Sequence, residues 1–142
     1  MKIEPMQPAE IEEMEAWRYE PPYDFYEYDG EPKKPERYFA ARDDDGSLLG
    51  FCYFEEKRDA LDYGLGLRPD LTGRGLGLAF FRAGLEFGRE RYRAQLIRLY
   101  VAAFNVRAIK VYERAGFRET GRHMRSFARW GEVEFVEMEE AS

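Results

Sequence analysis

The chain has 142 residues, of which 44% are hydrophobic and 35% charged, and this balance is typical of one folded domain rather than of a disordered protein. Its formal net charge of −6 disfavours a general nucleic-acid binder, which needs a positive surface to displace counterions from phosphate. The single cysteine excludes an internal disulfide, and no apolar run approaches the roughly 20 residues of a membrane span. The early prolines also interrupt any signal-peptide core. We predict one domain over residues 1–142, cytoplasmic, that binds neither nucleic acid nor a membrane.

The first predicted helix runs from Pro8 to Trp17, where apolar residues recur at three-residue steps with glutamates between them. Residues 17–31 then alternate aromatic and acidic side chains, and two prolines interrupt any long helix. For any single ring, covering the edge of the core is the simplest explanation. Together the side chains suggest a lid that attracts a cationic amine through cation–π contacts and opposite charge. The substrate-binding candidates are Trp17, Tyr23, Asp24 and Tyr26.

Two strands are predicted next, over residues 37–42 and 48–55, joined by an acidic turn that ends at Gly46. An antiparallel hairpin is the expected arrangement. Cys52 lies in an apolar run of the second strand, with no histidine nearby to activate it. We therefore interpret Cys52 as an inert core residue and not as a nucleophile.

Residues 60–67 predict a third strand, or a fourth if residues 1–6 form the first. Because side chains alternate along a strand, Asp62, Gly64 and Gly66 share one face. That face lacks bulk next to a carboxylate, so we expect it to admit a ligand.

A glycine-rich turn follows this strand and leads into a helix predicted from Gly75 to Arg91. Glycines at 73, 75 and 77 remove the Cβ atoms that would keep a ligand from the backbone, and the first-turn amides of the helix face the same place. The stretch predicts an anion cradle suited to phosphate. The residues match neither a P-loop nor a dinucleotide fingerprint, and an ordinary strand-to-helix turn is the simplest alternative.

The next segment, residues 95–101, predicts a buried strand, and the order strand, helix, strand predicts a right-handed crossover to a parallel partner. Asn105 is a candidate N-cap for a helix over residues 106–114, which Gly116 ends.

Residues 117–129 and 133–138 predict a closing hairpin whose arginines and glutamates form ion pairs on the sheet surface. The only histidine, His123, has no partner at metal-ligand spacing. We therefore predict no metal site.

Two motifs and their order make the chain resemble the GNAT superfamily of N-acetyltransferases. Residues 72–77, after the lead-in Leu67-Arg68-Pro69-Asp70, are similar to the family's phosphate loop, in which Arg or Gln precedes two residues, Gly, one residue, and Gly or Ala. Residues 105–117 are similar to its later Asn, Ala, Tyr and Gly-Phe pattern. The resemblance implies an α/β (α+β) fold with a mixed, mostly antiparallel twisted sheet flanked by helices and a parallel strand pair that splays apart at the cofactor site.

The implied reaction moves an acetyl group from acetyl-CoA to a primary amine without a metal. The implied cofactor-binding residues are Leu65, Leu67, Thr72, Gly73, Arg74, Gly75, Gly77, Leu78, Asn105, Ala108 and Tyr112. Thr72 departs from the family's Arg or Gln, so we expect the backbone cradle and the charge of Arg74 to bind the pyrophosphate.

Tyr112 aligns with the family's tyrosine that protonates the departing CoA thiolate, as a phenol with a reference pKa of ~10 can do. Asp62 stands where relatives often carry Glu and is the candidate general base. A hydrogen bond to a neighbouring loop explains Asp62 equally well, and Glu55 and His123 are alternative bases.

The expected acceptor is a small, amine-bearing, cationic molecule. A protein amino terminus or lysine is an alternative acceptor. A non-catalytic CoA-binding module and a structural interaction protein are the alternatives outside the enzyme class, and a homodimer is compatible with the sequence.

Overall fold

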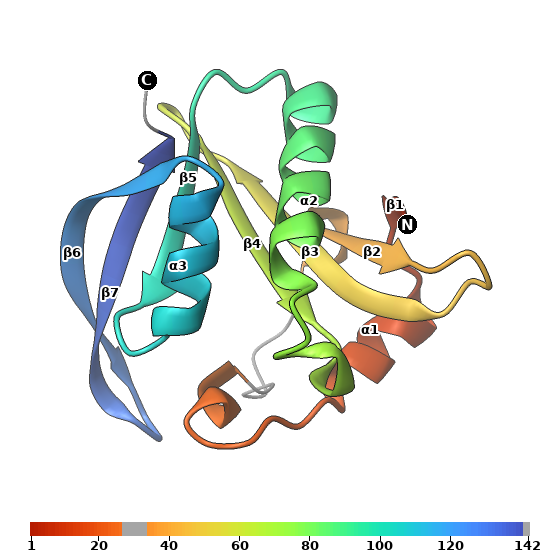
Figure 1. Cartoon of the computed structure of the whole chain (residues 1–142), viewed down its shortest axis with the longest axis horizontal. Coiled ribbons are helices and arrows are strands. Elements are labelled where there is room, and N and C mark those ends of the chain that lie inside the picture. The colour runs from red at the N-terminus through yellow and green to blue at the C-terminus, as the bar shows by residue number, and fades with distance from the viewer. Residues whose placement is uncertain (27–33, 141–142) are drawn as a thin grey trace.

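A seven-stranded sheet organises the computed structural model, which describes residues 1–26 and 34–140 (Figure 1). Its strands are β1 (Lys2–Pro5), β2 (Tyr38–Arg42), β3 (Leu48–Glu56), β4 (Leu61–Leu67), β5 (Ile97–Ala102), β6 (Phe117–Phe127) and β7 (Gly131–Glu140). The helices are α1 (Pro8–Glu15), α2 (Gly77–Tyr92) and α3 (Val106–Arg114), with 3₁₀ turns η1 (Tyr23–Tyr26), η2 (Pro35–Arg37) and η3 (Pro69–Leu71). The strand order is β1-β2-β3-β4-β5-β7-β6.

The pairing is antiparallel between all described neighbours except β4 and β5, which are parallel. Among the described residues, β4 and β5 pair only as Leu61 with Ile97 and Asp62 with Arg98, although both strands continue. The two strands therefore diverge toward their carboxyl ends. The predicted mixed sheet and its splayed parallel pair are confirmed.

The main core lies between the sheet and the two helices α2 and α3, which cover one face (Figure 1). The helix α2 packs closely because it presents glycines to the sheet: a Cβ at Gly84 would overlap the hydroxyl of Tyr63, and one at Gly88 would overlap the ring of Phe54. The Tyr63 hydroxyl donates to the carbonyl of Phe81 at 3.0 Å. Buried aromatic contact of this kind fixes β4 against α2.

A second, smaller cluster joins α1 to the opposite face of β2 and β3, and it consists of Met6, Met14, Trp17, Ala40 and Leu48. Phe51 packs against it, with its ring centroid 6.4 Å from that of Trp17. The two faces of the sheet are thus covered by different helices.

The helix boundaries differ from those expected at two places. The first helix ends at Glu15 rather than at Trp17, and α2 begins at Gly77 rather than at Gly75. The second difference has a clear cause, since Gly73 and Gly75 adopt φ of +74° and +77°, which a right-handed helix excludes. Residues 1–6 do contribute a strand, β1, so the strand over residues 61–67 is the fourth.

Candidate active site

A groove of about 660 Å³ lies where β4 and β5 diverge, and its lining comes from both faces of the sheet. We call the lining beside α2 and α3 the helix wall, formed by Gly73, Gly75, Gly77, Phe80, Asn105, Ala108, Val111 and Tyr112. We call the lining from the opposite face the strand wall, formed by Tyr38, Phe51, Tyr53, Tyr100 and Arg125. Because the backbones part at this point, two molecules can meet in the groove from opposite faces of the sheet.

The loop from β4 to α2 has the open backbone that the predicted anion cradle requires. The φ values of Gly73 and Gly75 are in the left-handed region, and a Cβ at Gly75 would meet no described atom within 4 Å. Arg68 braces the start of the loop, pairing with Asp70 at 2.6 Å and donating to the Leu48 carbonyl at 3.1 Å. The open backbone therefore precedes the amino terminus of α2, where unpaired amides and the helix dipole favour an anion.

A second arginine, which the sequence did not single out, lies beside this loop. Arg74 and Leu78 are not part of the groove lining, whereas Arg107 is. The Arg107 guanidinium lies 3.5 Å from the Cβ position of Gly73 and 4.3 Å from the ring centroid of Tyr23. The Thr72 hydroxyl donates to the Pro69 carbonyl at 2.7 Å and so stabilises the turn itself.

Leu65 and Leu67 both line the groove, as expected, and the second carries a further contact. The Tyr19 hydroxyl, from the segment after α1, donates to the Leu67 carbonyl at 2.7 Å. This bond ties that segment to the end of β4, next to the cradle.

Gly64 and Gly66, on the face of β4 that lacks bulk, both line the groove beside rings of the neighbouring strand. Phe51 lies opposite Gly66 and Tyr53 opposite Gly64 in the β3–β4 register, and a Cβ on Gly66 would overlap the Phe51 ring. Gly66 thus makes room for the Phe51 ring, whereas a Cβ on Gly64 would meet the Tyr53 ring at an ordinary 3.6 Å. The two rings line the groove together with the two glycines.

The helix α3 presents Asn105, Ala108 and Tyr112 to the groove, since residues three and four apart share one face of a helix. The Asn105 side chain accepts from the Ala108 amide at 3.1 Å, which confirms the predicted N-cap. The Tyr112 ring packs on Phe81, with centroids 4.8 Å apart. Tyr112 is therefore held by the core while it forms part of the helix wall.

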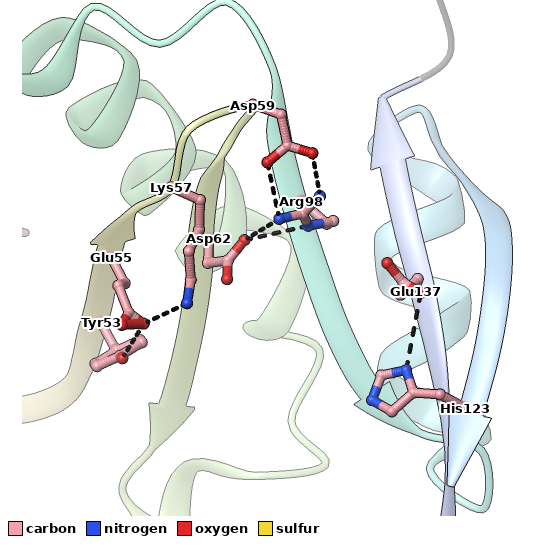
Figure 2. Close-up of polar contacts among 8 residues, drawn as sticks. All are labelled: Tyr53, Glu55, Lys57, Asp59, Asp62, Arg98, His123 and Glu137. Carbon is pink, nitrogen blue, oxygen red and sulfur yellow. Dashed lines mark hydrogen bonds and ion pairs between the residues drawn. The ribbon is translucent and has the colours of Figure 1, made fainter.

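Figure 2 shows the three candidate bases, of which Asp62 is the most buried, with 8% of its surface exposed. Its Oδ1 accepts from Arg98 Nε at 3.2 Å, and Arg98 Nη1 also pairs with Asp59 at 3.0 Å. Burial raises the pKa of Asp62, while Arg98 and Lys57 oppose that rise. A carboxylate with a raised pKa is better suited to accept a proton than an ordinary exposed aspartate.

Glu55 lies across from Asp62 in the β3–β4 register and contacts two cations, Arg37 at 2.7 Å and Lys57 at 3.3 Å. Burial raises its pKa, but the contacts with Lys57, Tyr53 and Arg37 outweigh burial and lower the pKa overall. The Tyr53 hydroxyl donates to Glu55 at 3.2 Å, so one hydrogen bond connects this carboxylate to the strand wall.

His123 lies on β6, 3.8 Å from the Glu137 carboxylate, and its Nε2 accepts from Arg125 Nε at 2.9 Å. None of the three candidate bases belongs to the groove lining formed by the described residues. A proton would therefore reach any of them through a water molecule or through a neighbouring side chain.

The substrate-binding candidates after α1 are placed in different surroundings. Tyr23 lines the groove, Trp17 is buried in the α1 cluster, and Asp24 pairs with Arg129 at 3.5 Å. Trp17 is thus a core residue here, contrary to the expectation. Tyr26 belongs to η1, but its side chain and residues 27–31 lie outside the described residues.

The segment that carries Tyr23 crosses from α1 toward the end of the β6–β7 hairpin, in orange in Figure 1. Phe25 anchors it there by packing against Phe104, Phe127, Trp130 and Phe135, with centroids 5.0 to 6.1 Å apart. The described part of the predicted lid is therefore anchored at Phe25 and contributes Tyr23 to the groove.

The sequence did not identify most residues of the strand wall, nor Tyr19 or Arg107, as site residues. For Tyr53 and Tyr100, the alternation of side chains along strands could have indicated the site, because both share a face of the sheet with Asp62. Cys52 is fully buried, and burial raises the pKa of its thiol to about 12, which fits the inert core residue that we expected.

Within residues 1–26 and 34–140, no group of three or more His, Cys, Asp or Glu side chains is arranged to hold a metal ion. No helix in those two stretches is long and apolar enough to cross a membrane.

The family model described as the Acetyltransferase (GNAT) family matches residues 3–117. Among curated proteins, the mycothiol acetyltransferase of Clavibacter sepedonicus is 42% identical over 86 residues, which are 60% of this chain and 28% of that protein. The mycothiol acetyltransferase of Mycolicibacterium gilvum is 39% identical over 102 residues, 66% of this chain and 34% of that protein. The chain therefore spans about a third or less of the length of these relatives.

Among solved structures, the spermidine N-acetyltransferase from Vibrio cholerae in complex with CoA and spermine superposes with a TM-score of 0.79. It covers 97% of this chain and 93% of its own, at 16% identity. A putative phosphinothricin N-acetyltransferase superposes with a TM-score of 0.65 at 17% identity and covers 79% of each chain. At such identities the likeness shows a common fold.

Proposed function

Because the chain belongs to the acetyltransferase (GNAT) family, we propose that it transfers an acetyl group from acetyl-CoA to a primary amine. The observation that carries this proposal is the splay between β4 and β5, which opens beside a glycine cradle and gives one groove two walls on opposite faces of the sheet. Such a groove lets a donor on the helix wall and an acceptor on the strand wall meet at the divergence.

The helix wall suits the elongated, anionic donor. The amides of the glycine loop and of the start of α2 would bind the pyrophosphate, with Arg107 as the nearby cation. The exposed backbone of β4 at Leu65 and Leu67 would bind the pantetheine amides and orient the carbonyl. When bound, acetyl-CoA supplies the activated thioester that the acceptor amine attacks.

The protein's own contribution to the chemistry is proton transfer and orientation. Tyr112 would hold a proton on its phenol oxygen, at the helix wall, for the departing sulfur. Asp62 would take the proton of the acceptor ammonium, whose reference pKa is ~10.4, through a bridging water. The burial that raises the pKa of Asp62 supports this role over Glu55, whose pKa is lowered by its cations.

The acceptor that we propose is a primary amine on a small molecule. The expected preference for a cationic acceptor depended on the acidic segment after Trp17, of which Asp24 already pairs with Arg129. The structural neighbour that binds spermine keeps polyamines as the second candidate class. A protein amino terminus or a lysine side chain is the third candidate class.

The proposal is tested by acetyl-CoA-dependent thiol release with a panel of amino acids, polyamines, aminoglycosides and peptides. We expect turnover with at least one panel member and none when acetyl-CoA is omitted. If calorimetry shows CoA binding but no panel member is turned over, the non-catalytic CoA-binding module replaces the enzyme. If CoA does not bind at all, the interaction-protein alternative replaces both.

A further inference from the structure

Two arginines line the groove, and they lie on opposite faces of the sheet. Arg107 belongs to α3 and is beside the glycine loop. Arg125 belongs to β6 and lies over Tyr100, whose neighbours Leu99 and Val101 point into the core under α2 and α3. Arg107 is therefore placed for the donor phosphates, whereas Arg125 faces whatever occupies the strand wall.

The side chain of Arg125 is held in place by three neighbours. Its guanidinium carbon lies 4.5 Å from the ring centroid of Phe135 and 5.1 Å from that of Tyr100, and its Nε donates to His123 at 2.9 Å. These contacts use the plane of the guanidinium and its Nε donor. The terminal nitrogens, which are the part of the fork that recognises planar anions, form no ion pair in the part of the chain that the structure describes.

The strand wall contains no carboxylate among its described residues. Of the acidic side chains nearest in the strand register, Asp62 pairs with Arg98, and Glu55 pairs with Arg37 and Lys57. Glu137, opposite Tyr100, lies 3.8 Å from His123 and does not line the groove. The charged side chain that lines the strand wall among the described residues is therefore Arg125, which repels a cation placed beside it and attracts a carboxylate.

We propose that the acceptor is an amino acid, a small molecule with both a primary amine and a carboxylate, and that Arg125 binds the carboxylate. This inference rests on the proposed acetyl transfer and narrows its acceptor class. The rings of Phe51, Tyr53 and Tyr38 border the same wall and suit an apolar or aromatic side chain. Binding the carboxylate at Arg125 places the molecule on the strand wall, with its amine toward the splay.

The test compares amino acids with the amines that lack only the carboxylate, for example phenylalanine with phenethylamine and leucine with isopentylamine. We expect the wild-type protein to acetylate each amino acid with a KM at least about tenfold lower than that of its matching amine, since a hydrogen-bonded ion pair contributes about 1.5–3 kcal/mol. Arg125→Gln should raise the KM of the amino acid at least about tenfold, leave kcat within about twofold and not alter the KM of the amine.

The matched control is Arg122→Gln, three positions earlier on β6, where the guanidinium pairs with Glu119 and Glu134 outside the groove. This control should keep the wild-type preference. Arg125→Lys, which keeps the charge but loses the fork, should give an intermediate KM and provides a second measurement if Arg125→Gln does not fold. Calorimetric binding of phenylalanine in the presence of CoA should weaken in both Arg125 variants.

Equal KM values for amino acids and their matching amines, or a preference for polyamines, would overturn the inference and leave the proposed acetyl transfer intact. An equal effect of Arg125→Gln on both kinds of acceptor would also overturn it. Absence of thiol release with every acceptor would instead contradict the proposed function.

Discussion

The helix wall takes its lining from two short continuous stretches, residues 73–80 and 105–112, whereas the strand wall gathers its side chains from β2, β3, β5 and β6. A stretch that is continuous in sequence keeps its spacing on any backbone, so a motif can identify it. Side chains from four strands meet only when the sheet register is known. The donor side of a groove like this can therefore be recognised from sequence, while the acceptor side has to be located in the fold.

The largest effect is expected at Tyr112 on the helix wall. Tyr112→Phe removes the proposed proton donor but keeps the ring that packs on Phe81, so kcat should fall about 10²-fold while CoA affinity stays near wild type. Steady-state thiol release and calorimetry measure the two quantities. Tyr92→Phe, in α2 and outside the groove lining, is the control. An unchanged kcat would remove Tyr112 from the chemistry.

Gly75 tests the cradle itself. Gly75→Val puts a branched side chain into the open space of the loop at a φ of +77°, so the Kd for CoA should rise about tenfold or more and the thermal stabilisation by CoA should disappear. Gly46→Val is the matched control, because Gly46 has a φ of +86° in a turn that does not line the groove. Both variants carry a backbone strain of about 1–2 kcal/mol, but only Gly75→Val should weaken CoA binding. If Gly75→Val binds CoA as tightly as the wild-type protein does, the phosphates bind elsewhere.

The pH profile tests Asp62, on the strand side. If Asp62 is the base, kcat/KM falls as the pH drops through its pKa, because the protonated carboxyl cannot accept a proton. Burial raises the pKa of Asp62 and Arg98 lowers it, so Arg98→Met should move the acidic limb of the profile to higher pH, and Asp62→Asn should abolish the limb.

Asp59→Asn serves as the control for Arg98, since it removes the other partner of Arg98 and keeps the contact with Asp62. Its acidic limb should stay close to that of the wild-type protein. If neither Arg98→Met nor Asp62→Asn changes the acidic limb of the kcat/KM profile, the base is Glu55 or His123.

The smallest effect concerns Cys52, which lies in the core beneath α2 and outside the groove lining. Because burial raises the pKa of this thiol to about 12, only about 10⁻⁴ of it is thiolate at pH 8, and a thiol reagent should react with it only when denaturant unfolds the protein. Mass spectrometry after timed labelling measures the rate. Fast labelling of the native protein with loss of activity would point to thiol chemistry in the groove.

The sequence was sufficient for the architecture near the groove because local patterns decide it. The order strand, helix, strand predicted the parallel pair of β4 and β5, the spaced glycines predicted a loop with open backbone before α2, and Asn105 at a helix start predicted a cap. Each of these rests on backbone geometry within one segment or between consecutive segments.

The remaining site residues could not be predicted because their roles depend on cross-strand register and on packing. Gly66 indicated open space and does line the groove, but the Phe51 ring that lies beside it could be located only from the β3–β4 register. Trp17 was expected to contact the substrate, but it belongs to the α1 cluster, where it packs against Phe51 without lining the groove. Arg107 could not be predicted because α3 brings it beside the loop, which no local pattern encodes.

Hydrogen exchange measured with and without CoA tests most directly whether the helix wall is the donor side. The amides of residues 73–78 and 105–112 should become protected when CoA binds, while exchange in residues 51–55 and 123–127 should not change. Protection confined to the strand segments, or no protection in the glycine loop, would contradict the assignment of the two walls.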